Sequence, residues 1–289
     1  MATLNDWISA SRPRTLPAAV APVLVGSGAA EALNGFRPGL ALLCLLVSLA
    51  LQVGVNFAND YSDGVRGTDA VRVGPTRLTA SGVVTPRQVK AAAFAAFAVA
   101  GVAGLVLAVL VTWWLVPVGV VCILAAWFYT GGPRPYGYAG YGEAFVFTFF
   151  GLVAVLGTTY VQARGISVVT VAAAIGIGLL ACALLVANNL RDVHTDASVG
   201  KRTLAVIIGE PMTRKLFALM IAVAFLAIIV VGLSHPWCLL ALLAAPLALD
   251  PIRRVIRGAA GRDLIAVLGA TGRLELAYAV ALTVGLVLD

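Results

Sequence analysis

Charged residues are scarce in this sequence, and their scarcity limits what kind of protein it can be. Asp, Glu, Lys and Arg make up 11% of the 289 residues, whereas about a quarter of a typical soluble domain is charged. Hydrophobic residues make up 61%, and the mean hydropathy is +0.99. These values exclude an ordinary soluble domain, and the long apolar runs predict an all-α integral membrane protein.

The sequence also lacks any paired arrangement of cysteines. Its four cysteines, Cys44, Cys122, Cys182 and Cys238, each stand alone in an apolar run, and none belongs to a CxxC. This spacing gives no indication of a thiolate metal site, and we interpret the four side chains as isolated core thiols. Because no low-complexity tract or long linker divides the chain either, we expect a single domain over residues 1–289.

Apolar runs close to the ~20 residues that cross a hydrocarbon core recur along the whole chain. We predict nine transmembrane helices in one bundle. They are expected at residues 16–33, 39–57, 91–111, 114–130, 144–162, 168–187, 215–233, 237–250 and 271–288.

Basic residues are distributed unequally between the two sides that these spans define. Eighteen of the twenty Lys and Arg lie on the side of the N-terminus, and only Arg37 and Arg164 lie on the other. The positive-inside rule therefore predicts a cytoplasmic N-terminus and an external C-terminus. Seventeen arginines against three lysines suggest a GC-rich bacterial genome, so we expect a multi-pass protein of a bacterial inner (plasma) membrane.

The net charge of +7 indicates what this basic face can meet. It suits membrane lipid or a phosphate-bearing substrate. Nucleic acid is not expected as a partner, because the basic residues lie in loops held at the bilayer surface. The sequence predicts no particular oligomeric state.

The first polar loop, "NFANDYSDGVRGTD", continues directly from the second apolar run. Asn56, Asp60 and Asp63 stand at i, i+4 and i+7, and Asn59 shares their helical face. Gly64 and Gly67 are expected to end this helix, and Asp69 to fold back from the loop that follows.

The second polar loop, "NNLRDVHTDASVGKRT", follows the sixth apolar run and repeats the pattern. Asn189, Asp192 and Asp196 stand at i, i+3 and i+7, and Asn188 precedes Asp192 by four. Both loops fall on the predicted cytoplasmic side, which suggests that they form one polar cap over the bundle.

Such clusters of acid are unfavourable unless a cation joins them. Carboxylates at a helix C-terminus oppose the helix dipole by about 0.3–1 kcal/mol each. Mg²⁺ prefers carboxylate and amide oxygens and is often shared with a substrate phosphate, so we predict a metal-diphosphate site on the cytoplasmic side. The outer phosphate oxygens would be neutralised by Arg66, Arg72, Arg77, Lys201 and Arg202. Each loop alone could instead be a solvated turn, and a transporter with an ion pathway is a second alternative.

Four stretches carry a resemblance to a known family. "NDYSDGVRGTD" with "VGPTRLTASG", and "NNLRDVHTDASVGKRTLAVIIG", resemble the two aspartate-rich motifs of the UbiA superfamily of membrane prenyltransferases. "YTGGPRPYGYAGYGE" and "SRPRTLPAAVAPVLVG" are similar to the branch that prenylates 1,4-dihydroxy-2-naphthoate in menaquinone biosynthesis. The chain departs from the broad pattern at Gly67, where the superfamily usually has a third aspartate; here that aspartate is Asp69.

The resemblance implies a Mg²⁺-dependent transfer of a polyprenyl group from its diphosphate to 1,4-dihydroxy-2-naphthoate. Diphosphate and CO₂ would leave, and demethylmenaquinone would form. A related transferase acting on another acceptor, such as 4-hydroxybenzoate, is the nearest alternative.

The resemblance also assigns roles to residues of this sequence. The catalytic residues would be Asp60, Asp63, Asp192, Asp196 and Lys201. The metal ligands would be the same four aspartates together with Asn56 and Asp69. The diphosphate would be bound by Asn56, Asn59, Arg66, Arg72, Arg77, Asn188, Asn189, Lys201 and Arg202. The aromatic substrate would be bound by Arg12, Tyr129, Arg134, Tyr136 and Glu143, with Arg12, Arg14 and Arg134 as alternatives for its carboxylate and Glu143 as a candidate general base.

Overall fold

The computed structural model describes residues 2–68, 77–233 and 235–289, and every regular element within them is a helix. The elements are α1 (Leu4–Ala10), η1 (Pro13–Thr15), α2 (Pro17–Ala32), α3 (Pro38–Arg66), α4 (Pro86–Leu110), α5 (Leu115–Phe128), η2 (Tyr136–Tyr138), α6 (Gly142–Val146), η3 (Phe147–Val153), α7 (Ala154–Ala163), α8 (Val168–Arg191), α9 (Val193–Ser198), α10 (Leu204–Gly232), η4 (Pro236–Ala244), α11 (Ala245–Ile256) and α12 (Asp263–Leu288). The prediction of an all-α protein is therefore confirmed for the described residues.

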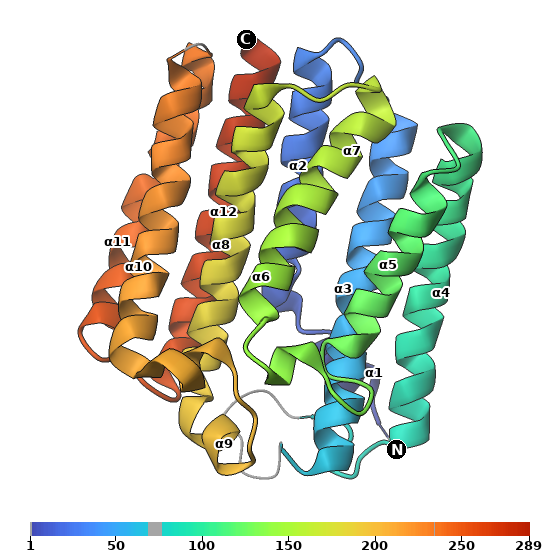
Figure 1. Cartoon of the computed structure of the whole chain (residues 1–289), viewed down its shortest axis with the longest axis vertical. Coiled ribbons are helices and arrows are strands. Elements are labelled where there is room, and N and C mark those ends of the chain that lie inside the picture. Colours follow the sequence, from blue (N-terminus) through green and yellow to red (C-terminus); the bar gives the residue numbers. More distant parts are fainter. Residues whose placement is uncertain (1, 69–76, 234) are drawn as a thin grey trace.

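The long helices lie side by side in a bundle, with the two termini at opposite ends (Figure 1). Helix α3 packs on α4, α8 on α10, and α12 on both α2 and η4. The short helix α9 lies at the same end of the bundle as the N-terminus, below α8 (Figure 1). The C-terminal ends of α3 and α8, which carry the two polar motifs, also lie at this end of the bundle (Figure 1).

Six helices among the described residues are long and apolar enough to cross a membrane, or seven if the bent pair Leu4–Thr15 and Pro17–Ala32 is one span. Nine spans therefore remain a prediction. Helix α5 has 14 residues, which at 1.5 Å per residue is shorter than a hydrocarbon core of about 30 Å. The segment 237–250 falls on η4, of 9 residues, and α11, of 12 residues, and each of them is also too short to cross the core alone.

Local sequence signals explain where several helices begin and end. Thr3, Thr85 and Ser167 form capping boxes at the starts of α1, α4 and α8, satisfying N–H groups that have no partner inside the helix. Gly67 ends α3 with a φ of 74°, a conformation that is costly for residues with a Cβ. Gly64, in contrast, stays inside α3, and the expectation that it ends the helix is wrong.

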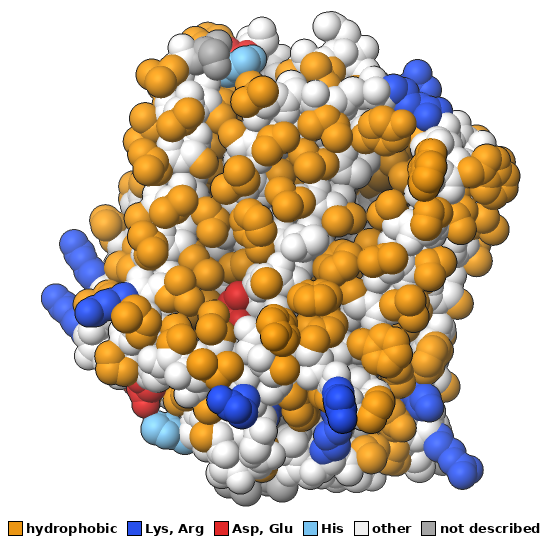
Figure 2. All heavy atoms as spheres, in the orientation of Figure 1, with side chains coloured by type: hydrophobic (Ala, Val, Ile, Leu, Met, Phe, Trp, Pro, Cys, Tyr) orange, Lys and Arg blue, Asp and Glu red, His pale blue; other side chains and the backbone are white. Residues whose placement is uncertain are grey.

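Small residues allow the helices around α8 to approach closely. A Cβ added to Gly151 would lie 2.7 Å from the Cα of Gly178, so these backbones are in direct contact. Such contacts are typical of helix packing in membranes, where water gives no hydrophobic driving force. On the face in Figure 2, hydrophobic side chains cover most of the surface and Lys and Arg gather mainly toward the lower end, as expected for a bundle surrounded by lipid.

Candidate functional site

A cavity of about 1080 Å³ lies inside the bundle and joins the two polar motifs to an apolar interior. At one end it is lined by acids, amides and bases from the ends of α3 and α8 and from the segment after α9. At the other end it is lined by aliphatic and aromatic side chains of α2 to α5 and of the α6–η3–α7 stretch. This stretch widens into a π-helix over Phe147–Val153, beside the cavity, and such widened turns are frequent at functional sites.

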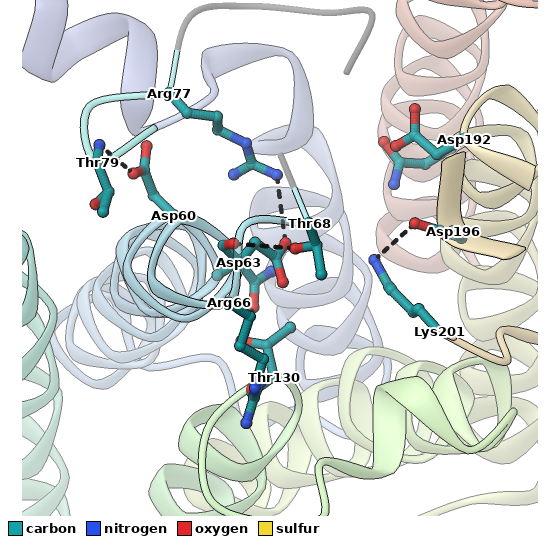
Figure 3. Close-up of polar contacts among 12 residues, drawn as sticks. Asp60, Asp63, Arg66, Thr68, Arg77, Thr79, Thr130, Asp192, Asp196 and Lys201 are labelled. Atoms are coloured by element: carbon teal, nitrogen blue, oxygen red, sulfur yellow. Dashed lines mark hydrogen bonds and ion pairs between the residues drawn. The ribbon is translucent and has the colours of Figure 1, made fainter. Parts of the chain in front are cut away.

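The two aspartates of α3 have different surroundings. Asp60 is fully buried, and its two carboxylate oxygens accept hydrogen bonds from the backbone N–H groups of Leu78 and Thr79, both at 2.9 Å. Asp60 therefore anchors the segment that begins at Arg77. It does not line the cavity. Asp63 does line the cavity; its Oδ1 accepts a hydrogen bond from the Tyr138 hydroxyl at 2.5 Å. Figure 3 shows Asp60 turned toward Thr79 and Asp63 turned toward Arg77 and Thr68.

Arg77 lies close to Asp63, with a nitrogen 3.7 Å from its Oδ2, and both side chains are buried. This pair belongs to the cavity lining. An arginine beside a carboxylate at a cavity wall neutralises one charge, and a guanidinium is well suited to contact an anion.

The amides of α3 connect the first motif to other segments. Asn56 donates to the backbone oxygen of Ser11 at 2.8 Å and to Thr15 at 3.2 Å, so it fixes the N-terminal segment. Asn59 accepts a hydrogen bond from Thr130 at 2.8 Å. Both amides also line the cavity.

The second motif is divided between two helices. Helix α8 ends at Arg191, and α9 begins at Val193. Asp192 lies between them with non-helical backbone angles, so the expectation that Asn189, Asp192 and Asp196 follow one continuous helix is wrong. The break turns Asp196 back toward the cavity that Asp192 also lines.

Arg191 is a site residue that the sequence analysis missed. Its guanidinium donates to both oxygens of Asp192, at 2.7 and 2.6 Å, and to Asn188 Oδ1 at 2.8 Å. A two-point arginine–carboxylate pair fixes both side chains firmly. The only signal in the sequence was its position beside Asp192, and basic residues at the end of a membrane helix are too common to stand out.

Asp196 and Lys201 form the other ion pair of this motif, with Nζ 3.3 Å from Oδ1. The second oxygen, Oδ2, is buried without a hydrogen-bond partner among the described residues. Burial, opposed by Lys201 and reinforced by Asp192, raises the pKa of Asp196 to about 6. A buried carboxylate oxygen without a donor fits a cation binding site.

Tyr138, in the short η2 helix, joins the two motifs. Its hydroxyl donates to Asp63, while Arg66 and Lys201 lie 5.1 and 5.2 Å from its ring centre. Its backbone oxygen accepts from the N–H of Arg202 at 3.0 Å. Burial and the charge of Asp63 raise the pKa of this phenol, so it remains a hydrogen-bond donor at neutral pH.

The structure brings most of the predicted residues to one cavity, and Figure 3 shows the aspartates of α3 on one side and Asp192, Asp196 and Lys201 on the other. The predicted residues that line the cavity are Arg12, Arg14, Asn56, Asn59, Asp63, Arg77, Tyr129, Tyr136, Asn188, Asn189, Asp192, Asp196 and Lys201. Those that do not line it are Asp60, Arg66, Arg134, Glu143 and Arg202. Asp69 and Arg72 lie outside the described residues.

Three of the residues outside the lining are otherwise engaged or exposed. Arg66 donates to the backbone oxygens of Thr130 and Gly132, in the loop after α5. The side chains of Arg134 and Arg202 are exposed. Arg66 therefore holds this loop against the end of α3.

The donor set of the cavity suits a hard cation that is shared with a ligand. Asp63, Asp192 and Asp196 contribute carboxylates to one cavity, yet no group of three acidic, His or Cys side chains in the described part of the chain forms a metal cage. Mg²⁺ is usually held by one or two carboxylates together with substrate phosphates, so the residues present fit that mode of binding.

Aromatic side chains form a row along the cavity wall. Tyr129 and Tyr136 meet edge to face at 5.5 Å, Tyr136 stacks on Phe145 at 3.9 Å, and Phe145 lies 6.0 Å from Phe149. The row runs from the η2 loop along the α6–η3 stretch. It offers flat apolar faces next to the polar end of the cavity, suited to an aromatic ligand or to a carbocation.

The sequence of this chain is similar to those of known proteins. The model of the UbiA prenyltransferase family matches residues 19–268. The 1,4-dihydroxy-2-naphthoate octaprenyltransferase of Mycobacterium tuberculosis is 52% identical over 281 residues, covering 97% of this chain and 96% of the relative. The protein of the same name from Escherichia coli is 39% identical, covering 87% of this chain and 85% of the relative.

A solved structure shares the fold. A UbiA homolog from Archaeoglobus fulgidus bound to GPP and Mg²⁺ aligns with a TM-score of 0.68 at 15% sequence identity, covering 96% of this chain and 99% of that protein. The family match extends over most of the chain, and the two aspartate-rich motifs both fall inside it. This chain therefore belongs to the UbiA prenyltransferase family.

Proposed function

We propose that this protein transfers a polyprenyl group from polyprenyl diphosphate to 1,4-dihydroxy-2-naphthoate in menaquinone biosynthesis. The carbon that bears the carboxylate forms the new C–C bond, the allylic C–O bond of the diphosphate breaks, and CO₂ and diphosphate leave. The immediate product is the hydroquinone form of demethylmenaquinone, because the transfer itself involves no oxidant. The observation that carries this proposal is one cavity that joins an acidic, basic and amide-rich end to an aromatic and aliphatic interior, and the names of the similar proteins support the choice of acceptor.

The diphosphate would lie between the two motifs. We assign Mg²⁺ to Asp63, Asp192 and Asp196; when bound, it would stabilise the negative charge that develops on the departing diphosphate. Lys201 and Arg77 would contact the outer oxygens, and Arg191 would hold Asp192 in place. These groups act where charge develops, which is the most effective place for electrostatic catalysis.

The remaining residues of the motifs receive supporting roles. Asp60 fixes the segment that carries Arg77, because it binds the next two backbone N–H groups. Asn56 and Asn59 would meet the diphosphate while holding the N-terminal segment and the η2 loop. Asn188 would act with them, oriented by Arg191. Asp69, Arg72 and Arg202 stay proposed contacts to the metal or the diphosphate.

The aromatic acceptor would bind beside the row of Tyr129, Tyr136, Phe145 and Phe149. This places a flat ring next to the reacting end of the allylic chain, and the ring faces would stabilise positive charge on it. Arg12 and Arg14 line the cavity and Arg134 does not, so we assign the acceptor carboxylate to Arg12 or Arg14. The prenyl tail would extend into the aliphatic part of the cavity, between α3, α4 and α5.

We further propose nine spans in a single domain over residues 1–289, with the N-terminus and the active site on the cytoplasmic side of a bacterial membrane. The distribution of basic residues supports this orientation. The termini at opposite ends of the bundle (Figure 1) agree with an odd number of spans.

The test is an assay of membranes that contain the protein, with labelled polyprenyl diphosphate and two acceptors offered side by side. We expect product from 1,4-dihydroxy-2-naphthoate, its loss on chelation, and its return on adding Mg²⁺. The Asp192→Asn variant should be inactive, whereas Asp250→Asn, on the exposed side of α11, should behave as the wild type. Product from 4-hydroxybenzoate alone would refute the acceptor, and ion or solute flux without any product would favour a transporter.

A further inference from the structure

Glu143 and Asn189 form a buried pair at the edge of the cavity. Glu143 lies in the first turn of α6 and Asn189 in the last turn of α8. The Nδ2 of Asn189 donates to Glu143 Oε1 at 2.9 Å. Both side chains are buried, but only Asn189 belongs to the cavity lining.

This hydrogen bond decides which way the Asn189 amide points. A carboxylate only accepts hydrogen bonds, so Glu143 must face the NH₂ group of the amide and not its oxygen. The carbonyl oxygen Oδ1 is on the opposite corner of the amide. Asn189 therefore offers the cavity a hydrogen-bond acceptor, and Glu143 keeps it in that orientation.

The surroundings show which part of the cavity receives this oxygen. Gly142, next to Glu143, lies against Tyr129: a Cβ at Gly142 would be 3.5 Å from the Tyr129 hydroxyl oxygen. Tyr129 begins the aromatic row along the wall. The Sγ of Cys182 donates to the backbone oxygen of Glu143 at 3.1 Å and holds α6 against α8. Asn189 thus stands beside the aromatic row, while Asp192 follows toward the diphosphate end.

We propose that Glu143 is a positioning residue, which fixes Asn189 Oδ1 as the acceptor for a ring hydroxyl of the aromatic substrate. The inference rests on the proposed function and identifies Asn189 Oδ1 as the atom that recognises the ring hydroxyl of the acceptor. Accepting this hydrogen bond increases the electron density of the ring, including the neighbouring carbon that attacks the prenyl group. In this role Glu143 keeps its protonation state throughout the reaction and takes no proton from the substrate.

Exchanging the two side-chain types tests the orientation directly. In Asn189→Asp two carboxylates face one another, and we expect the KM for the aromatic acceptor to rise about tenfold, the order of magnitude of one hydrogen bond. In the double variant E143Q/N189D the new amide at position 143 can donate to the carboxylate at 189, which again offers an oxygen to the cavity. We expect it to recover most of that loss.

Two more variants and a control separate positioning from proton transfer. Glu143→Gln keeps an acceptor for Asn189 and should lose less than Glu143→Leu, which keeps none. Glu275→Gln is the matched control, because Glu275 is likewise a buried glutamate that does not line the cavity. It should leave the KM for the acceptor and the KM for prenyl diphosphate unchanged. All variants are compared at equal amounts of monodisperse protein after gel filtration.

Three results would overturn the proposal. The double variant could be no better than Asn189→Asp, Glu143→Gln could be as impaired as Glu143→Leu, or the change could fall on the KM for prenyl diphosphate and on the Mg²⁺ requirement instead of the acceptor. Failure of the proposed function itself is distinguishable, since the wild-type protein would then give no product from 1,4-dihydroxy-2-naphthoate.

Discussion

Replacing Tyr138 by Phe should weaken the connection between the two motifs without removing any charged residue. The hydroxyl donates to the buried Asp63 at 2.5 Å, and the ring lies next to Arg66 and Lys201. Phe keeps the ring and removes the donor. A hydrogen bond to a charged group contributes about 1.5–3 kcal/mol, and Arg77, 3.7 Å from the other oxygen, is placed to offset part of the loss.

We therefore expect Tyr138→Phe to raise the Mg²⁺ concentration for half-maximal activity about tenfold, corresponding to about 1.4 kcal/mol. The measurement is a Mg²⁺ titration of prenyl transfer at saturating acceptor. Tyr138→Leu also removes the ring and its contacts with two cations, so it should be more impaired, with a higher KM for prenyl diphosphate. Tyr141→Phe is the matched control, since Tyr141 lies on the same loop and is 60% exposed.

An unchanged Mg²⁺ requirement in Tyr138→Phe would refute this reasoning. It would mean that the Asp63 carboxylate is held well enough by other groups, and that the hydroxyl has no part in shaping the diphosphate end of the cavity. An equal loss in Tyr141→Phe would point to a general disturbance of the loop.

Two further predictions concern stability and chain-length selection. Asp60→Ala leaves two backbone N–H groups without an acceptor, so it should lower the free energy of unfolding by about 1–3 kcal/mol for each group. The measurement is the melting temperature in detergent, which should fall. An unchanged melting temperature would contradict the anchoring role of Asp60. Gly104→Phe adds a ring to the aliphatic part of the cavity, where a Cβ meets no atom within 4 Å. It should reduce kcat/KM for a long prenyl diphosphate far more than for a short one, whereas Val109→Phe, on the exposed side of α4, should affect neither; equal losses for both lengths would place the tail elsewhere.

The two polar motifs illustrate how far local periodicity can predict a site. For α3 the spacing predicted most of the arrangement: the helix continues past the apolar run to Arg66 and ends at Gly67, so Asn56, Asn59 and Asp63 reach one cavity, whereas Asp60 does not. For the second motif the same spacing failed, because the chain breaks at Asp192 and a new short helix carries Asp196. Helical spacing holds only while the helix continues, and the sequence has no proline or glycine at this break to announce it.

The sequence by itself determined that the chain is a helical membrane protein with two acidic motifs, because hydrophobic runs and the residues beside them are local properties. Only the tertiary structure decided which side chain does what within the site. Tyr138 meets Asp63 across 75 positions of sequence, and Asn189 meets Glu143 across 46. Asp60 and Asp63 look alike in the sequence. Asp60 nevertheless accepts hydrogen bonds from two backbone N–H groups of a loop, whereas Asp63 lines the cavity. Such contacts depend on how whole helices pack, and no spacing along the chain encodes that arrangement.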